Sequence, residues 1–468
     1  ENTTPKEILE NIKKKSADSS LLFGNTTRLQ TVEQLRDQHR FFHHELEFLE
    51  IVKENGGFDV IVGNPPWLKL LFEEKDIIAE QFPEILIRKT SAPEVRKLQQ
   101  SYLVDVDDHK EGYFAEAIAI EGAAQFMNAI QNYPLLVGQQ TNLYKCVLEN
   151  GFSPLSRDGI IGSLHPEGVY DDPNGQLLRE NIYKRLLFHF QFRNELSLFS
   201  EVSHTREFSV NVLGNVKANI NFISISNLYH PSTIATSTIH PGNGIVGSFK
   251  IKDSLTGKNA WNIQPHKSRV INIQENDLKM ISKTFEGGTD WAGVKLVNIH
   301  AVEIMNVLKK LGDYPNKLKH SDTKVTVCWD ETNDVNAGNI KSKTKYPDVD
   351  KFEMIYKGTH LYVCNPLYKS PKQIYDKSSD FETIDLTKIP DAFVARTVYV
   401  PQHVKAGYAS IMPGFKIKND SSGKPVYDNW LDYYKLGFRK MLDKGMERTL
   451  IGAILPPNSS HINGVISV

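Results

Sequence analysis

The sequence predicts an α/β fold, with a doubly wound domain over residues 1–218 followed by a mixed α/β domain over residues 219–468. Three observations favour this class: short β-branched runs in the first half, helical segments that alternate with them, and a change near Asn215–Asn219 to sequence rich in Ser, Thr, Asn, Gly and Pro. Such alternation is typical of a sheet with helices packed on its faces. A chain of 468 residues is also too long for one core.

The first domain is expected to be built from elements that follow one another along the chain. Phe58–Gly63 is a β-branched run ended by Gly and two prolines, which predicts a strand buried on both faces of a parallel sheet. Residues 68–133 are rich in Glu, Lys, Ala and Gln and predict a helical insertion. Residues 5–40 predict mostly helix, interrupted by a short strand at Leu21–Phe23 and a turn at Gly24-Asn25. The further elements expected are helices over 141–155 and 177–187, and strands over 159–164 and 207–213.

Composition narrows the class of protein. Charged residues make up 24% and hydrophobic residues 40%, as in ordinary globular proteins. The net charge of −1 means that a nucleic-acid partner would need a local basic surface. The three cysteines are far apart and fit neither a disulfide framework nor a zinc site, so we expect free thiols and a cytoplasmic location. No apolar run is long enough to cross a membrane, and no membrane partner is expected.

The tetrad Asn64-Pro65-Pro66-Trp67 directly follows the first predicted strand, where ligands of open α/β sheets bind. The exocyclic amine of adenine is a poor nucleophile, because its lone pair is delocalised into the ring. The amide oxygen of Asn64 and the carbonyl of Pro65 could both accept its hydrogens, since the two prolines hold the backbone extended. Trp67 could stack on a base swung out of a duplex. The simpler alternative is a stiff turn with one core tryptophan.

Phe58–Trp67 resembles the catalytic motif of amino-methyltransferases, usually Asn-Pro-Pro-aromatic. That tetrad also occurs in enzymes that methylate glutamine amides of release factors and guanine amines of ribosomal RNA. Several further segments resemble large type IIG-like restriction-modification methyltransferases and phage-defence methyltransferases of the BREX and DISARM kinds. These segments are Leu22–Asn25, Phe42–Phe48, Thr141–Tyr144, Gly159–Pro166, His204–Val210, Asn365–Lys369, Ile389–Asp391, Arg396–Pro401, Glu447–Ile451 and Leu455–Pro457.

The resemblance implies a Rossmann-like class I methyltransferase domain and a target-recognition domain. It implies transfer of a methyl group from S-adenosylmethionine to N6 of an adenine flipped out of double-stranded DNA, with other restriction or phage-defence subunits as partners. Gly24, Asn25, Asn64 and Asn142 match donor-binding positions, and Phe199 or Phe208 matches an aromatic on the far face of the base. His165-Pro166 departs from the usual Val-Pro pair.

The family's glycine-rich donor loop is not found in residues 1–63, so we expect the catalytic domain to be incomplete at its N-terminus. This leaves two alternatives: a non-catalytic DNA-specificity fragment, and an amino-methyltransferase that acts on RNA or protein glutamine. Candidate phosphate contacts are basic residues of the second domain. They are Lys341, Lys343, Lys345, Lys357, Lys369, Lys372, Arg439, Lys440 and Arg448.

Two patterns resemble other functions but stand in the wrong context. Gly242–Gly247 spells a dinucleotide-binding loop, yet it leads into an alternating strand-like run and not a helix, which favours a hairpin turn. Pro347-Asp348 with Glu353 and Lys357 resembles a metal-nuclease pattern, but the spacing does not put Glu353 and Lys357 on one strand face. We therefore predict surface charges there, no metal site and no DNA cleavage by this chain.

Overall fold

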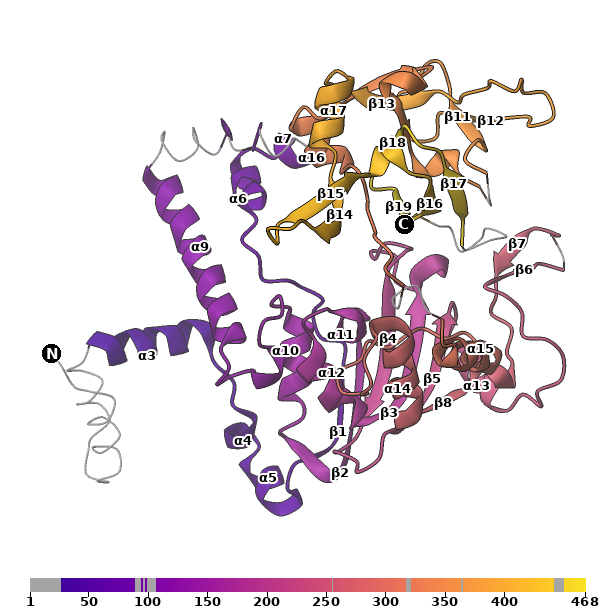
Figure 1. Cartoon of the computed structure of the whole chain (residues 1–468). Helices are drawn as coiled ribbons and strands as arrows, with labels where there is room; N and C mark the ends of the chain where they lie inside the picture. Colours follow the sequence, from indigo (N-terminus) through magenta and orange to yellow (C-terminus); the bar gives the residue numbers. More distant parts are fainter. Residues whose placement is uncertain are drawn as a thin grey trace. The chain divides into compact units, whose positions relative to one another are not determined.

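The computed structural model describes residues 27–88, 94–95, 97–98, 107–254, 256–316, 321–362, 365–441 and 450–468. The chain divides into two compact units, Glu1–Asp313 (unit 1) and Tyr314–Val468 (unit 2) (Figure 1). Cys146 and Cys328 are buried free thiols, as expected. Across the described residues, no helix combines the length and the apolar character that crossing a membrane requires.

Unit 1 is built on one six-stranded mixed sheet, in the order β1-β2-β4-β3-β5-β8. β1, β2, β3 and β5 run in one direction, whereas β4 and β8 run in the other. The four strands that share a direction bring their carboxyl ends to the same edge of the sheet. The strands are β1 (Phe58–Gly63), β2 (Leu155–Pro166), β3 (Leu186–Arg193), β4 (Glu207–Leu213), β5 (Asn221–Leu228) and β8 (Ile271–Gln274).

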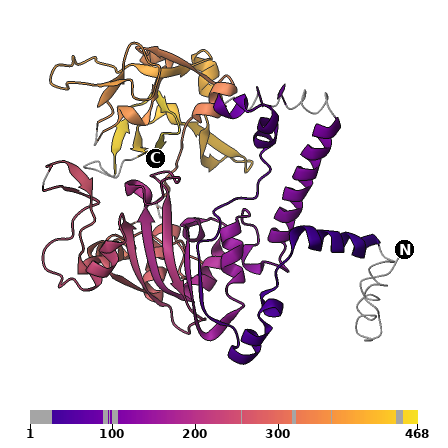
Figure 2. The same ribbon diagram turned by 180° about the vertical axis from the view of Figure 1, so that it is seen from behind.

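Helices pack on one face of this sheet and form the largest apolar core of unit 1. Ile161 of β2 and Phe222 of β5 meet Leu148, Leu178 and Leu278 from three helices there. Figure 2 shows the strands from behind, with other helices of unit 1 between them and the long helix α9. The helices are α3 (Thr27–His39), α4 (His44–Glu47), α5 (Leu49–Asn55), α6 (Glu74–Gln81), α7 (Glu84–Ile87), α9 (Asp107–Asn128), α10 (Leu143–Asn150), α11 (Gly168–Asp171), α12 (Gln176–Tyr183), α13 (Ser232–Thr238), α14 (Glu275–Ile281) and α15 (Val302–Asp313).

The expectation that Phe58–Gly63 is buried on both faces is wrong. Among the described residues, β1 pairs only with β2 and so stands at the edge of the sheet. Val60 is 58% exposed and Val62 is 78% exposed, while Ile61 on the opposite face packs against the helical core. A doubly wound fold would cover both faces, but within the described residues the face that carries Val60 and Val62 retains exposed apolar side chains.

Three boundaries differ from the sequence expectation. The helix expected over 141–155 ends at Asn150, and β2 already begins at Leu155. The helix expected over 177–187 ends at Tyr183, and Leu186 already begins β3, because a turn at Lys184 and Arg185 separates them. The boundary between the two compact units falls after Asp313 and not after residue 218, because β5 and β8 belong to the central sheet of unit 1. The functional division at residue 218 stays a prediction. In the described part of 68–133, helices α6, α7 and α9 agree with the predicted helical insertion.

Unit 2 consists of short strands and two short helices around small apolar cores. Trp329, Tyr408 and Leu431 lie in one core, and Ile451 and Leu455 lie in another. Its elements are α16 (Glu331–Asn336), α17 (Lys405–Ile411), β9 (Ile340–Lys345), β10 (Met354–Tyr356), β11 (Lys369–Pro371), β12 (Phe381–Thr383), β13 (Thr397–Pro401), β14 (Gly414–Asn419), β15 (Pro425–Asn429), β16 (Lys435–Arg439), β17 (Gly452–Leu455), β18 (Ser459–His461) and β19 (Val465–Ser467).

His461 makes the stability of unit 2 depend on pH. Its buried ring lies 2.6 Å (Nε2) from the Ser467 hydroxyl and 3.2 Å (Nδ1) from the Ile462 carbonyl. Burial lowers the pKa of His461 from 6.5 to about 4. Below pH 6.5 the unfolded chain therefore binds a proton that the folded unit does not, and stability falls as the pH decreases from 6.5 towards 4.

We expect this histidine to account for about 3 kcal/mol of the stability lost over that pH interval. Urea unfolding at pH 7 and pH 4 measures the loss, and His461→Gln should lose less between the two pH values than the wild type. An equal loss in both proteins would contradict the assignment.

Candidate functional site

The Asn64–Trp67 tetrad directly follows β1 at the carboxyl edge of the sheet. Asn64 is exposed, and its amide makes no hydrogen bond to any residue in the described part of the chain. Pro65 is buried and Pro66 is exposed, so the two prolines fix the backbone between an exposed amide and a half-buried indole. An amide oxygen without an intramolecular partner is free to accept hydrogen bonds from a ligand.

Trp67 packs on two phenylalanines that the sequence had also singled out. Its ring centroid lies 5.8 Å from Phe199 in an edge-to-face contact and 5.9 Å from Phe208. Phe208 is 2% exposed and is stacked on Phe192, with centroids 5.4 Å apart. Phe208 is thus part of the apolar packing against the indole, and the half-buried Phe199 lies beside it. The contact of either ring with a base stays a prediction. The indole Nε1 is buried without a hydrogen-bond partner among the described residues.

The start of α10 is held against the segment that follows the tetrad. The Leu143 amide donates to the Leu68 carbonyl at 2.9 Å, and Lys69 pairs with Asn142 as an isolated antiparallel bridge. This pairing fixes Asn142 beside the tetrad loop although 75 residues of sequence separate Asn142 from Trp67. The Asn142 Oδ1 atom is buried, and in the described part of the structure it accepts no hydrogen bond. A buried acceptor of this kind marks a place where a ligand donor would be stabilised.

A cavity of about 830 Å³ opens at this edge of the sheet. Its size lies within the range of small-molecule sites. Asn64 and Pro65 are outside its lining and lie just before Trp67 in the chain. The lining comes from the tetrad loop, the start of α10, the end of β2 and the loop before β4. It comprises Trp67, Lys69, Asn142, Tyr144, Pro166, Glu167, Gly168, Asp171, Val202, Ser203, Thr205, Arg206 and Glu207.

Glu167 places a buried carboxylate in the cavity wall. Its Oε1 atom lies 3.2 Å from Nε2 of the fully buried His189, whose Nδ1 lies 3.0 Å from the Ser224 hydroxyl. Burial favours the neutral acid, but the imidazole of His189 and the hydroxyl of Ser209 outweigh burial and lower the pKa of Glu167. At neutral pH the wall of the cavity therefore carries the ionised carboxylate of Glu167, with the imidazole of His189 beside it.

His165 is held neutral beside Glu167 by a chain of hydrogen bonds. The Asn211 amide nitrogen lies 2.9 Å from His165 Nε2, and the Tyr170 hydroxyl donates to the Asn211 oxygen at 2.6 Å. The remaining nitrogen, Nδ1, then donates to the Pro166 carbonyl at 2.9 Å. Burial lowers the pKa of His165, in agreement with a neutral ring. This network gives the unusual His165-Pro166 pair a structural role in positioning the end of β2.

Gly168 allows the Tyr144 ring to pack closely against the chain at the wall of the cavity. A Cβ atom at this position would lie 2.9 Å from the Tyr144 hydroxyl, so a side chain here would displace that ring. Tyr144 in turn is stacked on His165 with centroids 5.7 Å apart. Burial raises the pKa of Tyr144, which therefore remains a neutral hydroxyl in the wall.

The structure brings together some of the residues expected from the sequence and not others. Trp67 and Asn142 line one cavity, whereas Gly24 and Asn25 lie outside the described residues. Tyr144 lies in the Thr141–Tyr144 segment that the sequence analysis singled out, whereas sequence reasoning missed Glu167. The available signal for Glu167 was its place at the end of a predicted strand, directly after the unusual His165-Pro166 pair.

In unit 2, two of the predicted phosphate contacts are occupied by ion pairs. Lys345 Nζ lies 2.6 Å from Glu353, and Lys357 Nζ lies 3.2 Å from Glu331. Lys341 and Lys343 on β9 are exposed, and Arg448 lies outside the described residues. Glu353 is thus a structural partner of Lys345. The described residues contain no group of three His, Cys, Asp or Glu side chains placed to hold a metal ion.

Gly242–Gly247 is a loop with positive φ at Gly242 and Gly244. It leads into the hairpin of β6 (Lys250–Lys252) and β7 (Asn259–Trp261), and it does not open a helix. The dinucleotide-loop interpretation is therefore not supported by the structural context.

Residues 1–91 match the family described as the Eco57I restriction-modification methylase. This segment contains the tetrad, and the match supports a methylase role for the chain, which implies a methyl donor. A search of curated proteins gave no match.

Three solved structures show weak likeness. The type IIL restriction-modification enzyme MmeI in complex with DNA has a TM-score of 0.32 and 8% identity, over 87% of this chain and 40% of that one. The ATP-dependent type ISP restriction-modification enzyme LlaBIII bound to DNA has a TM-score of 0.20 and 13% identity, and the match covers 39% of this chain and 11% of that one. A modification subunit of a putative type I restriction enzyme from Vibrio vulnificus YJ016 has a TM-score of 0.25 and 10% identity, and the match covers 64% of this chain and 70% of that one. This chain thus corresponds to less than half of the MmeI and LlaBIII chains.

Proposed function

We propose that this chain, whose first 91 residues match a restriction-modification methylase family, methylates N6 of an adenine extruded from a specific site in duplex DNA. The proposal includes S-adenosylmethionine as donor, a Rossmann-like arrangement for unit 1, and a place in a cytoplasmic restriction-modification or phage-defence system with other subunits. One observation carries it: the Asn64–Trp67 tetrad lies inside the matched segment and ends at a cavity of suitable size. Target recognition is proposed for unit 2.

The chemistry of the tetrad follows from its free acceptors. When bound, S-adenosylmethionine supplies an electrophilic methyl group. The Asn64 amide oxygen and the Pro65 carbonyl accept the two hydrogens of the exocyclic amine and draw the nitrogen towards tetrahedral geometry, which releases its lone pair from the ring. Trp67 stacks on the base and keeps the amine in place. The N–C bond would form as the S–C bond of the donor breaks, S-adenosylhomocysteine would leave, and the cationic nitrogen would then lose one proton to water. No base with a perturbed pKa is therefore needed before the methyl group is transferred.

The residues present fit a polar, nitrogen-rich ligand in the cavity. Asn142 offers a buried acceptor and Trp67 a buried donor, and neither has an intramolecular partner among the described residues. Each group would cost stability unless a ligand or water satisfies it. The Asn142 oxygen would accept a hydrogen bond from an N–H group of S-adenosylmethionine or of the base. The Trp67 Nε1–H would donate a hydrogen bond to an acceptor atom of the ligand.

The carboxylate of Glu167 is proposed to stabilise the positive charge that develops on the amine nitrogen during transfer. A fixed charge in a protein site acts more strongly than the same charge in bulk water. We expect Glu167→Gln to lower kcat by about ten- to a hundred-fold, since it removes the charge while its amide oxygen can still accept from His189. Incorporation of a labelled methyl group measures kcat.

Glu180→Gln is a matched control, because Glu180 pairs with Lys184 on the surface of α12. It should leave kcat unchanged. A Glu167→Gln enzyme that is folded and as fast as the wild type would remove the carboxylate from the mechanism.

Two measurements separate the proposed function from its alternatives. Calorimetry with S-adenosylmethionine should show binding, which a non-catalytic DNA-specificity fragment would lack. Transfer assays with duplex DNA, ribosomal RNA and release factor should show methylation of DNA alone. Methylation of RNA or of a protein glutamine instead would show that DNA is not the substrate.

A further inference from the structure

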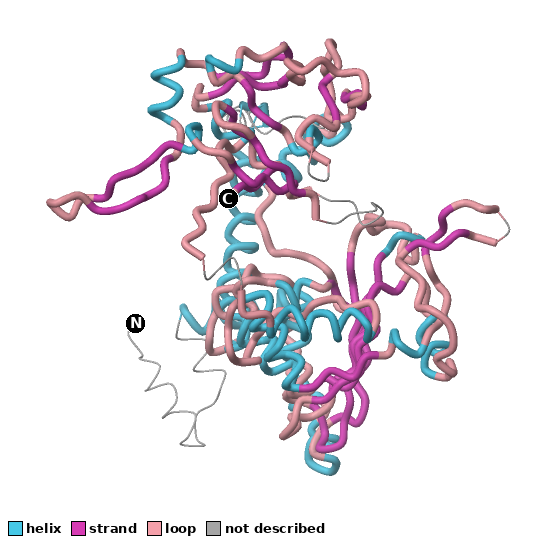
Figure 3. Tube along the Cα trace, turned by 45° about the vertical axis from the view of Figure 1, so that its right-hand side comes forward, coloured by secondary structure: helices cyan, strands magenta, loops and turns pink. Residues whose placement is uncertain are grey.

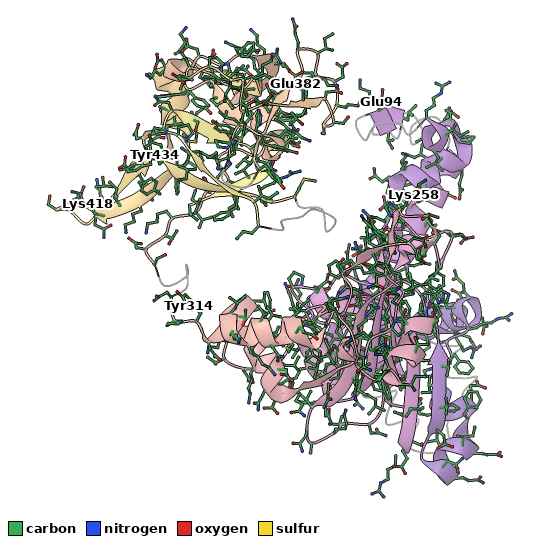
Figure 4. All side chains as sticks on the ribbon, turned by 90° about the vertical axis from the view of Figure 1, so that its right-hand side faces the viewer. Glu94, Lys258, Tyr314, Glu382, Lys418 and Tyr434 are labelled. Atoms are coloured by element: carbon green, nitrogen blue, oxygen red, sulfur yellow. The ribbon has the colours of Figure 1, made fainter. Side chains whose placement is uncertain are left out.

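A two-stranded ribbon projects from unit 2. It is formed by β14 and β15, residues 414–429, and is called the basic ribbon below. Figure 3 shows it as a hairpin that extends away from the rest of the unit, and Figure 4 shows Lys418 on its outer part. Isolated two-stranded hairpins are only marginally stable in water, so a ribbon of this length needs an anchor at its base.

The base of the basic ribbon is anchored in the core of unit 2. Phe415 packs on Trp430 with ring centroids 4.6 Å apart and on Tyr433 at 5.5 Å. The Asn429 amide donates to the Ala409 carbonyl of α17 at 2.7 Å. These contacts fix the base of the ribbon on unit 2, while residues 416–425 of its outer half are exposed.

The outer half carries positive charge that the protein itself does not neutralise. Lys416, Lys418 and Lys424 are exposed, and none forms an ion pair with a described residue. They differ in this from Lys345 and Lys357, which are tied to glutamates elsewhere in the unit.

The acidic residues of the basic ribbon are already engaged. Asp420 accepts backbone hydrogen bonds from Ser422 at 2.8 Å and Lys424 at 2.9 Å and so closes the turn. Asp428 accepts from the Tyr433 hydroxyl near the base. The lysine side chains therefore face solvent with no carboxylate within the ribbon committed to them.

Large side chains accompany these charges. Ile417 is 51% exposed and Tyr427 is 62% exposed. Tyr427 lies opposite Lys416 in the register, and the register shifts between Lys416 and Lys418, which places Ile417 at an irregularity. A tyrosine with an exposed hydroxyl can both stack and hydrogen-bond.

We propose that the basic ribbon enters the major groove of duplex DNA, with Lys416 and Lys418 on phosphates and Tyr427 towards base edges. The inference rests on the proposed function, in which the chain acts on duplex DNA. The groove is about 12 Å wide and admits a two-stranded ribbon, whose strands lie about 4.8 Å apart. The unpaired lysines complement the phosphate backbone, and their contacts would be independent of sequence.

The test uses the full chain and a pool of random-sequence duplexes, so that the target site need not be known. We expect Lys416→Gln/Lys418→Gln to weaken binding and to reduce the slope of log affinity against log salt concentration by about 1 to 2, because each phosphate contact contributes about 0.9. Lys416→Arg/Lys418→Arg retains both charges and should keep the wild-type slope. Fluorescence anisotropy at several salt concentrations measures the slope.

Lys351→Gln/Lys388→Gln is the matched control, since it also removes two charges from unit 2. Both lysines are exposed and paired with aspartates. It should leave the slope unchanged. If the folded Lys416→Gln/Lys418→Gln variant keeps the slope of the wild type, the assignment of the basic ribbon alone is overturned. If the wild-type chain binds no duplex, both this inference and the proposed function are overturned. An equal effect on single-stranded DNA would exclude groove binding.

Discussion

Asn64→Ala is expected to lower kcat/KM for methyl transfer by at least about a hundred-fold, as loss of a single preorganised hydrogen-bonding group in an active site does. The free energy of unfolding should change by no more than about 0.5 kcal/mol, because Asn64 is exposed and its amide has no partner in the described part of the fold. Labelled methyl incorporation and urea unfolding measure the two quantities on the same preparation.

Asn243→Ala provides the control for this change. Asn243 is also exposed, makes no hydrogen bond to a described residue and lies outside the cavity. Its activity and stability should match the wild type. If the Asn64→Ala protein transfers methyl groups at the wild-type rate, the amine is not oriented by this amide.

Trp67→Ala is expected to affect both stability and activity. The indole packs on Phe199 and Phe208 and contacts two apolar clusters of unit 1, so its removal should cost about 3 kcal/mol of unfolding free energy. Loss of base stacking, worth about 1 to 3 kcal/mol, should in addition lower kcat/KM about ten- to a hundred-fold. Thermal unfolding and methyl transfer below the midpoint temperature separate the two effects.

Trp67→Phe distinguishes a stacking platform from a core residue. A phenyl ring retains a π-face, so this variant should keep transfer within about ten-fold of the wild type while it recovers most of the stability. A purely structural Trp67 would instead give an alanine variant that is less stable but fully active at low temperature.

The local pattern was sufficient for the strands that end in sharp turns. Phe58–Gly63 stops at a glycine and two prolines, and Glu207–Leu213 alternates, so both could be predicted. β3 was missed because its apolar run continues that of the preceding helix without a glycine or proline between them. The direction of β4 and the edge position of β1 depend on pairing between distant segments, which a single sequence does not record.

The candidate site also combines a local pattern that the sequence shows with contacts between distant segments that it does not. The Asn64–Trp67 tetrad carries its chemistry within four consecutive residues, so it could be proposed before the structure. The Glu167–His189 pair joins positions 22 residues apart and depends on how β2, β4 and β3 align. Likewise, ion pairing of Lys345 and exposure of Lys418 are tertiary properties. The sequence analysis named Lys345 as a candidate phosphate contact and missed Lys418, because neither property can be read from the sequence alone.

Nucleoside analysis of treated DNA tests the central proposal most directly. Genomic DNA from a strain without adenine methylation contains every possible target, so it can be incubated with the chain and S-adenosylmethionine, digested and measured by mass spectrometry. We predict N6-methyladenine with the wild-type protein and none above background with Asn64→Ala. Equal N6-methyladenine with both proteins, or a wild-type protein that binds the donor and leaves adenine unmodified, would contradict the account.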